Sequence, residues 1–182
     1  DKHIVVDVAG GLEVTGVTTL TANTGSSASN ATLIVDKAAV FTGGVVLNDN
    51  TGLAILELEQ NNAVTISGDI TAAANNEGTI QMTGTGKTLS GDIGTSSVKL
   101  KEVQVDAASG NLTGTVYTTL LDVNAAVTLT GAVTVGTATI DAATLVNGTL
   151  TGTTVTMGAG DVLTTASDLT AAMVVTNATS SI

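Results

Sequence analysis

A change of parity inside an alternating stretch is the feature that most limits how this chain can fold. From Val127 onward the apolar residues fall on every second position with threonines between them, which is typical of a strand with one buried face. After Gly136 and Thr137 the apolar positions continue at Ala138 and Ile140, on the opposite parity. A strand that ran straight on would turn its apolar face into water, so the chain must bend here.

A short phrase also recurs, in which an apolar residue is followed by Thr or Ser and then by Gly. Its glycines are Gly16, Gly43, Gly68, Gly84, Gly91, Gly114, Gly131 and Gly152. The steps from Gly43 to Gly68, Gly91 and Gly114 are 25, 23 and 23 residues, in the range of one turn of a solenoid. The later steps of 17 and 21 residues make the repeat degenerate.

The composition indicates a thin core. The apolar residues are almost all aliphatic, with one Phe, one Tyr and no Trp, whereas aromatic side chains usually dominate compact cores. The 21 glycines supply bends, and the absence of Pro suits a chain whose backbone N–H groups are mostly paired in ladders. We therefore predict an all-β fold, a β-solenoid (β-helix-like) of short strands with Gly and Asn corners. A β-sandwich or jelly roll is the alternative.

The 182 residues fit one β-rich domain or one segment of a repeat structure. Residues 1–20 predict an N-terminal strand or arm that includes a strand at Ile4–Val8, and the polar residues 21–30 predict a loop. Leu53–Glu59 alternates as a strand does, while Asp69–Asn76 alone suggests a turn or two of helix. Other expected strands and corners are Ala31–Thr42, Val45–Leu47, Val64–Gly68, Thr79–Gly84, Lys87–Gly91 and the corner at Asn147-Gly148.

The charge balance excludes several classes of partner. The net charge is −11, from 16 acidic residues against five lysines and no arginine. Nucleic-acid binding needs clustered cations, and anionic membrane surfaces repel such a chain, so we expect neither partner. Without cysteine there is neither a disulfide framework nor a Cys-based zinc site. No apolar run approaches the ~18 residues of a membrane span, so we expect no membrane insertion.

Catalytic candidates are sparse. The single histidine, His3, lies near the start of the sequence, and Glu57 and Glu59 are the best carboxylate pair because they share a strand face. Polar residues two apart on a strand are more often simply its solvated face. Gly84–Thr88 is similar to a phosphate loop, but Gln81 stands where that motif needs its first glycine, and a turn is expected instead. We predict that the protein is not an enzyme and has no catalytic or cofactor-binding residue.

Two further patterns concern ions and glycans. Asn48–Gly52 is the nearest fragment to a calcium loop, but it holds one carboxylate and predicts a turn, so we predict no metal site. Four Asn-X-Ser/Thr sequons are candidate glycan acceptors if they lie at exposed corners. They are at Asn30, Asn111, Asn147 and Asn177.

Residues 88–135, TLSGDIGTSSVKLKEVQVDAASGNLTGTVYTTLLDVNAAVTLTGAVTV, resemble the passenger regions of bacterial autotransporters. The likeness is to rickettsial outer-surface (S-layer-like) proteins and related adhesins, and lies in the GDIGT…LKEVQV…LTGTVYTTLLDV cadence. This resemblance implies a β-helix exposed on the cell surface that works in coat formation or adhesion.

These observations give two functional expectations. The first is a structural, secreted or cell-surface protein that self-associates into a surface layer or extracellular filament. Unpaired strand edges, with Ile4–Val8 as a strand for donation, would join copies into a homo-oligomer or polymer. The second is an adhesin-type binding module that contacts host or neighbouring cells, through weak or multivalent contacts because hot-spot residues are scarce.

Overall fold

The structure, a computed structural model, describes residues 2–23, 29–59, 61–108, 110–177 and 180–182. These residues form β-strands, turns and bends with no helix, which confirms the all-β prediction. The strands form three sheets, named A, B and C here. Sheet A contains β1 (Lys2–Val6), β4 (Ala31–Val35), β7 (Ala54–Leu58), β10 (Glu77–Met82), β12 (Leu100–Val105), β14 (Val116–Val123), β16 (Val133–Ile140), β18 (Leu150–Met157) and β20 (Leu169–Thr176).

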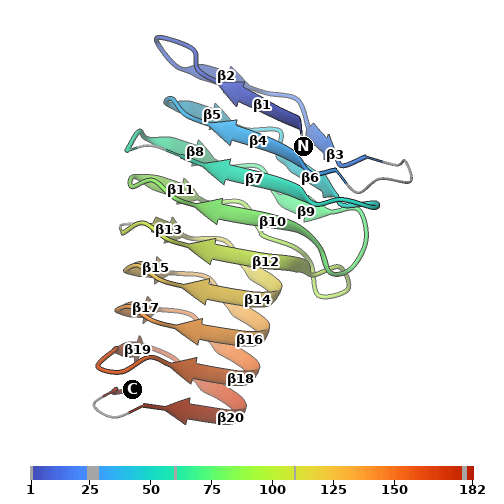
Figure 1. Ribbon diagram of the computed structural model, residues 1–182. Helices are drawn as coiled ribbons and strands as arrows, with labels where there is room; N and C mark the ends of the chain where they lie inside the picture. The colour runs from blue at the N-terminus through green and yellow to red at the C-terminus, as the bar shows by residue number, and fades with distance from the viewer. Residues whose placement is uncertain (1, 24–28, 60, 109, 178–179) are drawn as a thin grey trace.

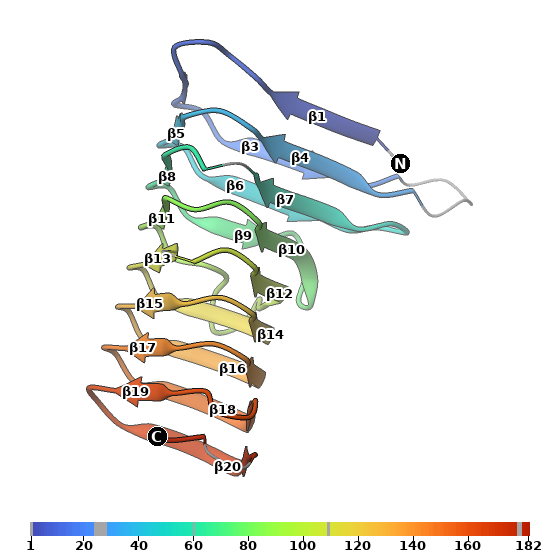
Figure 2. The ribbon, with the colours of Figure 1, turned by 60° about the vertical axis from the view of Figure 1, so that its left-hand side comes forward.

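Sheets B and C complete the circuit. Sheet B contains β2 (Leu12–Val14), β5 (Ala39–Phe41), β8 (Val64–Ile66), β11 (Lys87–Leu89), β13 (Gly110–Leu112), β15 (Val127–Leu129), β17 (Thr144–Val146) and β19 (Leu163–Thr165). Sheet C contains β3 (Thr18–Thr21), β6 (Val45–Asn48) and β9 (Ile70–Ala72). The chain passes from A to B to C and back to A, and each such circuit is called a coil below. Figures 1 and 2 show these coils stacked from the N-terminal strands to the C-terminal ones.

All strand pairs among the described residues are parallel. A jelly roll, the alternative expectation, is built from antiparallel strands. Parallel neighbours need a long crossover, and here the crossover is the rest of one coil rather than a helix. Backbone pairing between coils therefore runs along the whole stack.

The core lies inside the coils and is aliphatic. Alternate residues of each strand point inward, so that one inward position of sheet A repeats from coil to coil, as in Leu56, Ile80 and Val103. Phe41 is the aromatic residue of this core. Such narrow coils leave no room for a thick aromatic centre, which explains the composition.

The predicted bend is present, but inside one strand. In β16, Val133 and Val135 are buried on one parity, and Ala138 and Ile140 are buried on the other. The register with β14 and with β18 skips Gly136, so this residue marks the bend. The expectation of two strands with a corner between them is therefore replaced by one continuous bent strand. The corner at Asn147-Gly148 lies between β17 and β18, as predicted.

The length of a coil falls along the chain, which explains the degenerate repeat. The register advances 23 residues from Ala31 to Ala54, but 17 from Val116 to Val133. In the long coils a loop separates sheet C from sheet A. From β14 onward one bent strand occupies both positions. Single parallel bridges through Ile93 connect the strands of sheet C to Val116, the first residue of β14. The repeat thus loses one loop.

Stacked glycines account for much of the recurring phrase. An added Cβ on Gly114 would overlap the carbonyl oxygen of Gly91, and Gly131 stands in the same way over Gly114. The glycines of this column are Gly16, Gly43, Gly68, Gly91, Gly114, Gly131 and Gly148. The phrase also selects Gly84 and Gly152, which do not lie on this column, and it omits Gly148. Close backbone approach between coils, rather than a positive φ, is what requires most of these glycines.

One element was predicted wrongly. The helix expected at Asp69–Asn76 is instead β9 followed by a turn. The carbonyl oxygen of Asp69 accepts a hydrogen bond from Val45 N at 2.9 Å, and Ile70 is buried in register with Val45. Pairing with the preceding coil outweighs the local preference of the alanines for a helix. At the N-terminus, the strand expected at Ile4–Val8 is β1, which ends at Val6.

Candidate functional surfaces

The two ends of the stack expose apolar side chains. At the N-terminal end these are Ile4, Val5, Val8 and Val17, and at the C-terminal end they are Val162, Met173, Val174, Val175 and Ile182. β1 and β20 are the outermost strands of sheet A, so one edge of each is unpaired within the described residues. Unpaired edges with apolar side chains are templates for another strand.

The N-terminal end is also hollowed. A cavity of about 620 Å³ opens between β1 and β3, on the inner side of the first coil. It is lined by Lys2, His3, Ile4, Thr19, Leu20, Thr21 and Ala31. The cavity exposes inner positions that the next coil covers elsewhere in the stack.

Loops gather at the corner between sheets C and A in the long coils. This loop corner comprises residues 49–53, 73–76 and 94–99, and projects from one side of the stack (Figure 1). Its exposed side chains are mostly Asn, Thr and Ser. The loops are tied to each other, because Asn75 Oδ1 accepts a hydrogen bond from Lys99 N at 2.9 Å.

Asp49 anchors the loop corner from inside. Its buried carboxylate accepts hydrogen bonds from Ala54 N at 2.8 Å and from Gly78 N at 3.0 Å, which joins two successive coils. The segment Asn48–Gly52 therefore forms a turn whose acidic side chain is occupied by backbone N–H groups. Sequence reasoning identified the turn but not this role of Asp49.

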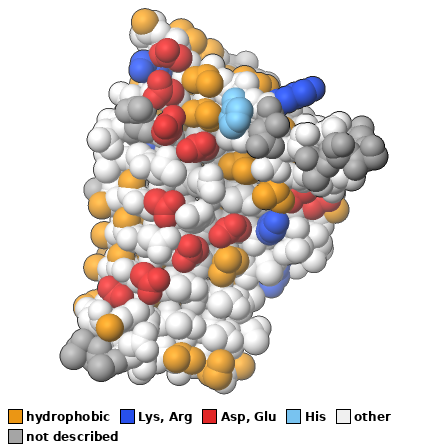
Figure 3. All heavy atoms as spheres, in the orientation of Figure 1, with side chains coloured by type: hydrophobic (Ala, Val, Ile, Leu, Met, Phe, Trp, Pro, Cys, Tyr) orange, Lys and Arg blue, Asp and Glu red, His pale blue; other side chains and the backbone are white. Residues whose placement is uncertain are grey.

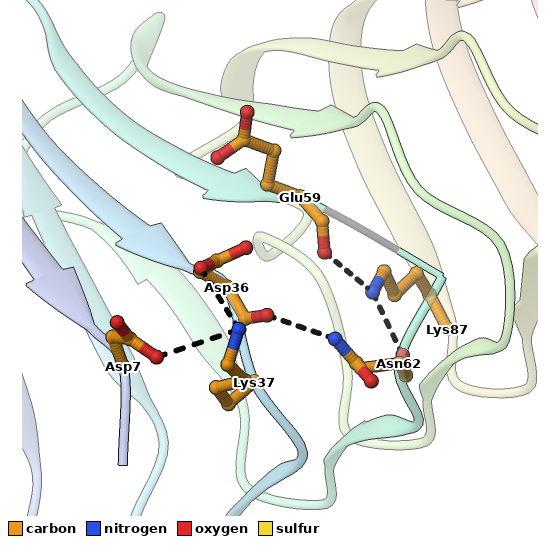
Figure 4. Close-up of polar contacts among 6 residues, drawn as sticks. All are labelled: Asp7, Asp36, Lys37, Glu59, Asn62 and Lys87. Carbon is orange, nitrogen blue, oxygen red and sulfur yellow. Dashed lines mark hydrogen bonds and ion pairs between the residues drawn. The ribbon is translucent and has the colours of Figure 1, made fainter. Parts of the chain in front are cut away.

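A second polar cluster lies where the chain leaves sheet A for sheet B (Figure 4). Lys87 is buried at an inward position of β11, and its Nζ donates to the carbonyl oxygens of Glu59 at 2.9 Å and Asn62 at 2.8 Å. Burial lowers the pKa of Lys87, and the nearby charge of Asp36 opposes this shift. The ammonium group holds together the turn of the preceding coil. The sequence signal for this burial is that Lys87 stands two positions before the apolar Leu89, on the same face of the strand.

The same cluster continues toward the N-terminus. Asn62 Nδ2 donates to Asp36 O at 2.9 Å, and Lys37 Nζ lies 3.3 Å from Asp36 Oδ2 and 3.4 Å from Asp7 Oδ1 (Figure 4). Hydrogen bonds from its ammonium to Asp36 and Asp7 raise the pKa of Lys37. The contacts thus connect three successive coils and serve to stabilise the stack.

The outer face of sheet A is acidic (Figure 3). Burial raises the pKa of Glu57, and the charge of Glu59 raises it further, while His3 opposes the shift. The structure therefore places the predicted carboxylate pair, Glu57 and Glu59, together on the outer face of sheet A, as the alternation of this stretch indicated. In Figure 4 the Glu59 carboxylate points away from Lys87, whose partner is the Glu59 carbonyl group.

A neighbouring network occupies the same face. Asn124 Nδ2 donates to Asp106 Oδ1 at 2.9 Å and to Asp122 Oδ2 at 3.0 Å. Burial raises the pKa of Glu102, and the charge of Asp122 adds to this rise. The Asn124 amide thus bridges the carboxylates of Asp106 and Asp122, which belong to adjacent coils.

The phosphate-loop-like segment and the four sequons occupy bends, strands and strand ends. Gly84–Gly86 form a bend that enters β11 with no helix after it, unlike a phosphate loop. Among the sequons, Asn147 is exposed at its corner, whereas Asn111 lies half-buried in β13. The side chain of Asn30 accepts a hydrogen bond from Leu53 N at 3.0 Å, and that of Asn177 donates to Met157 O at 2.9 Å.

Among the described residues, no three or more His, Cys, Asp or Glu side chains are grouped so that they could hold a metal ion. That part of the chain also has no helix long and apolar enough to cross a membrane. No family model, curated protein or solved structure matches the chain.

Proposed function

We propose that this chain is a β-solenoid that serves as a structural protein of the cell surface or extracellular space, without catalytic activity. In this proposal its copies self-associate into a surface layer or filament. The parallel register of three sheets and the passage of the chain from A to B to C support the solenoid. The resemblance to autotransporter passenger regions supports the location.

The observation that carries self-association is the gathering of exposed apolar residues at the unpaired ends. β1 already pairs with β4 of its own chain, so it offers its free edge rather than a released strand. An edge of this kind accepts a strand from another copy by extension of the sheet. The donor-strand expectation for Ile4–Val8 therefore becomes a proposal of edge addition.

Negative-stain electron microscopy and analytical ultracentrifugation of the purified chain test this function. We expect regular polymers whose amount grows with protein concentration. Dispersed monomers at every concentration would rule out self-association. The variant Ile4→Lys places a charge on the N-terminal edge and is expected to reduce assembly.

A second candidate function is an adhesin-type binding module, which the loop corner favours. Insertions in repeat proteins gather on one face, and that face is often the one that binds. Exposed Asn, Thr and Ser side chains supply adaptable hydrogen bonds. Binding of monomeric chain to cells, lost when residues 94–99 are shortened but retained in Ile4→Lys, would favour this function over the first.

A further inference from the structure

We propose that copies of this chain join head to tail, with β20 of one copy pairing in parallel with β1 of the next. This inference rests on the proposed self-association and specifies the partner, the two contacting strands and their register. The occupant of each open end is thus the opposite end of a second copy.

The position of the exposed apolar side chains supports this interface. Of the eleven large apolar side chains exposed among the described residues, nine lie either in the first coil or after β18. The other two, Val40 and Leu145, lie on sheet B between the ends. Monomeric proteins rarely expose contiguous apolar patches without a partner.

The register inside the chain predicts the register across the junction. One inward column of sheet A starts at Ile4, passes through buried members such as Leu56 and Val155, and ends at Val174. The end members are 59% and 40% exposed because no coil covers them. Continuing the column by one step places Ile4 of one copy on Val174 of its neighbour, and Val5 on Val175.

The polarity follows from the strand direction. A head-to-head contact about a two-fold axis would make β1 antiparallel to its copy and put the two loop corners on opposite sides. A head-to-tail contact keeps the pairing parallel, as in every described pair, and keeps each sheet in line with its counterpart. Such a contact is heterologous and does not close, so it generates a filament.

Cysteine cross-linking tests the polarity directly, because the chain has no cysteine of its own. Val5→Cys and Val175→Cys are made in separate chains, one of them isotope-labelled, and each is oxidised alone and in a mixture. Adjacent strands are ~4.8 Å apart, which lies within the Cα separation that a disulfide accepts. We expect a mixed disulfide in the mixture and little product from either chain alone.

Other products would overturn the inference in recognisable ways. A dominant Val5→Cys homodimer would show head-to-head contact, and a Val175→Cys homodimer tail-to-tail contact. Polymers without the mixed disulfide would refute this interface but leave self-association standing. Absence of polymers would refute the proposed function itself.

A charge placed at the junction provides a second readout. Val174→Lys should raise the concentration needed for assembly by at least about tenfold, because a junction that buries an apolar side chain would have to bury a charge. Val40→Lys is the matched control, since Val40 is also 40% exposed but lies on β5, away from both ends. Equal effects of the two variants would contradict the assignment. Circular dichroism of the monomers checks that both are folded.

Discussion

The replacement Gly114→Ala tests whether close stacking of glycines holds the coils together. A Cβ added to Gly114 would overlap the Gly91 carbonyl oxygen and lie 2.6 Å from the Gly91 carbonyl carbon. Carbon atoms prefer a separation of ~3.5–4.0 Å, so the two coils would have to separate locally by about 1 Å. The atoms in the way are backbone, which cannot rotate aside as a side chain does.

The cost follows from the neighbouring hydrogen bonds. Thr113 N donates to Leu89 O at 2.8 Å and Thr115 N to Asp92 Oδ1 at 2.7 Å, on either side of Gly114. Overpacking costs about 1–3 kcal/mol, and each weakened hydrogen bond about 0.5–1.5 kcal/mol. The lower chain entropy of Ala in the unfolded state returns about 0.4–1 kcal/mol. We expect a net loss of roughly 2–4 kcal/mol in the free energy of unfolding.

Urea unfolding followed by circular dichroism measures this loss, with Gly16→Ala as the control. Gly16 ends the same sequence phrase, but a Cβ there would meet no atom within 4 Å, and its φ is not positive. We expect Gly16→Ala to match or slightly exceed the native protein in stability. Similar midpoints for Gly114→Ala and Gly16→Ala would refute the stacking explanation.

Two further changes examine the polar contacts of the stack. Lys87→Met keeps the length of the side chain but removes the ammonium group that holds Glu59 O and Asn62 O. We expect the free energy of unfolding, measured in urea, to fall by about 1–3 kcal/mol. The control Thr88→Val lies on the outer side of the same strand and should have little effect. Equal stability of Lys87→Met and the native protein would disprove this role. The pKa of Glu102 is raised in the folded state, so ionisation of this carboxyl group destabilises the fold as pH rises through that pKa. At about pH 3 the carboxyl group is protonated in both the folded and the unfolded state, and the destabilisation vanishes. Glu102→Gln should therefore raise the urea midpoint at pH 7 and not at pH 3, in contrast to the control Glu13→Gln on the exposed side of β2. A lower midpoint of Glu102→Gln at pH 7 would contradict the expected direction of the effect.

Much of the fold could be predicted from local pattern. Alternation located strands such as β7, and the parity change at Gly136 located a bend that every short coil repeats. The helix expected at Asp69–Asn76 was wrong because local propensity carries no information on the preceding coil, with which Ile70 pairs. The change in coil length was visible as uneven spacing, but its cause, the loss of the loop between sheets C and A, requires the register.

The candidate surfaces were less predictable than the strands. Glu57 and Glu59 could be placed on one face because both belong to one stretch of strand. Lys87 and Asp49 act on backbone groups of other coils, so no pattern within their own segments names those partners. Which apolar side chains remain exposed at the two ends depends on which positions a neighbouring coil covers. This can be seen only when the coils are stacked in the structure.

Diffraction from aligned filaments of the purified chain measures whether parallel strands stack along one axis and whether successive copies continue this stack. We expect a reflection at ~4.7–4.9 Å, the spacing between paired strands, along the filament axis. A reflection at this spacing perpendicular to the axis, or none at all, would contradict it.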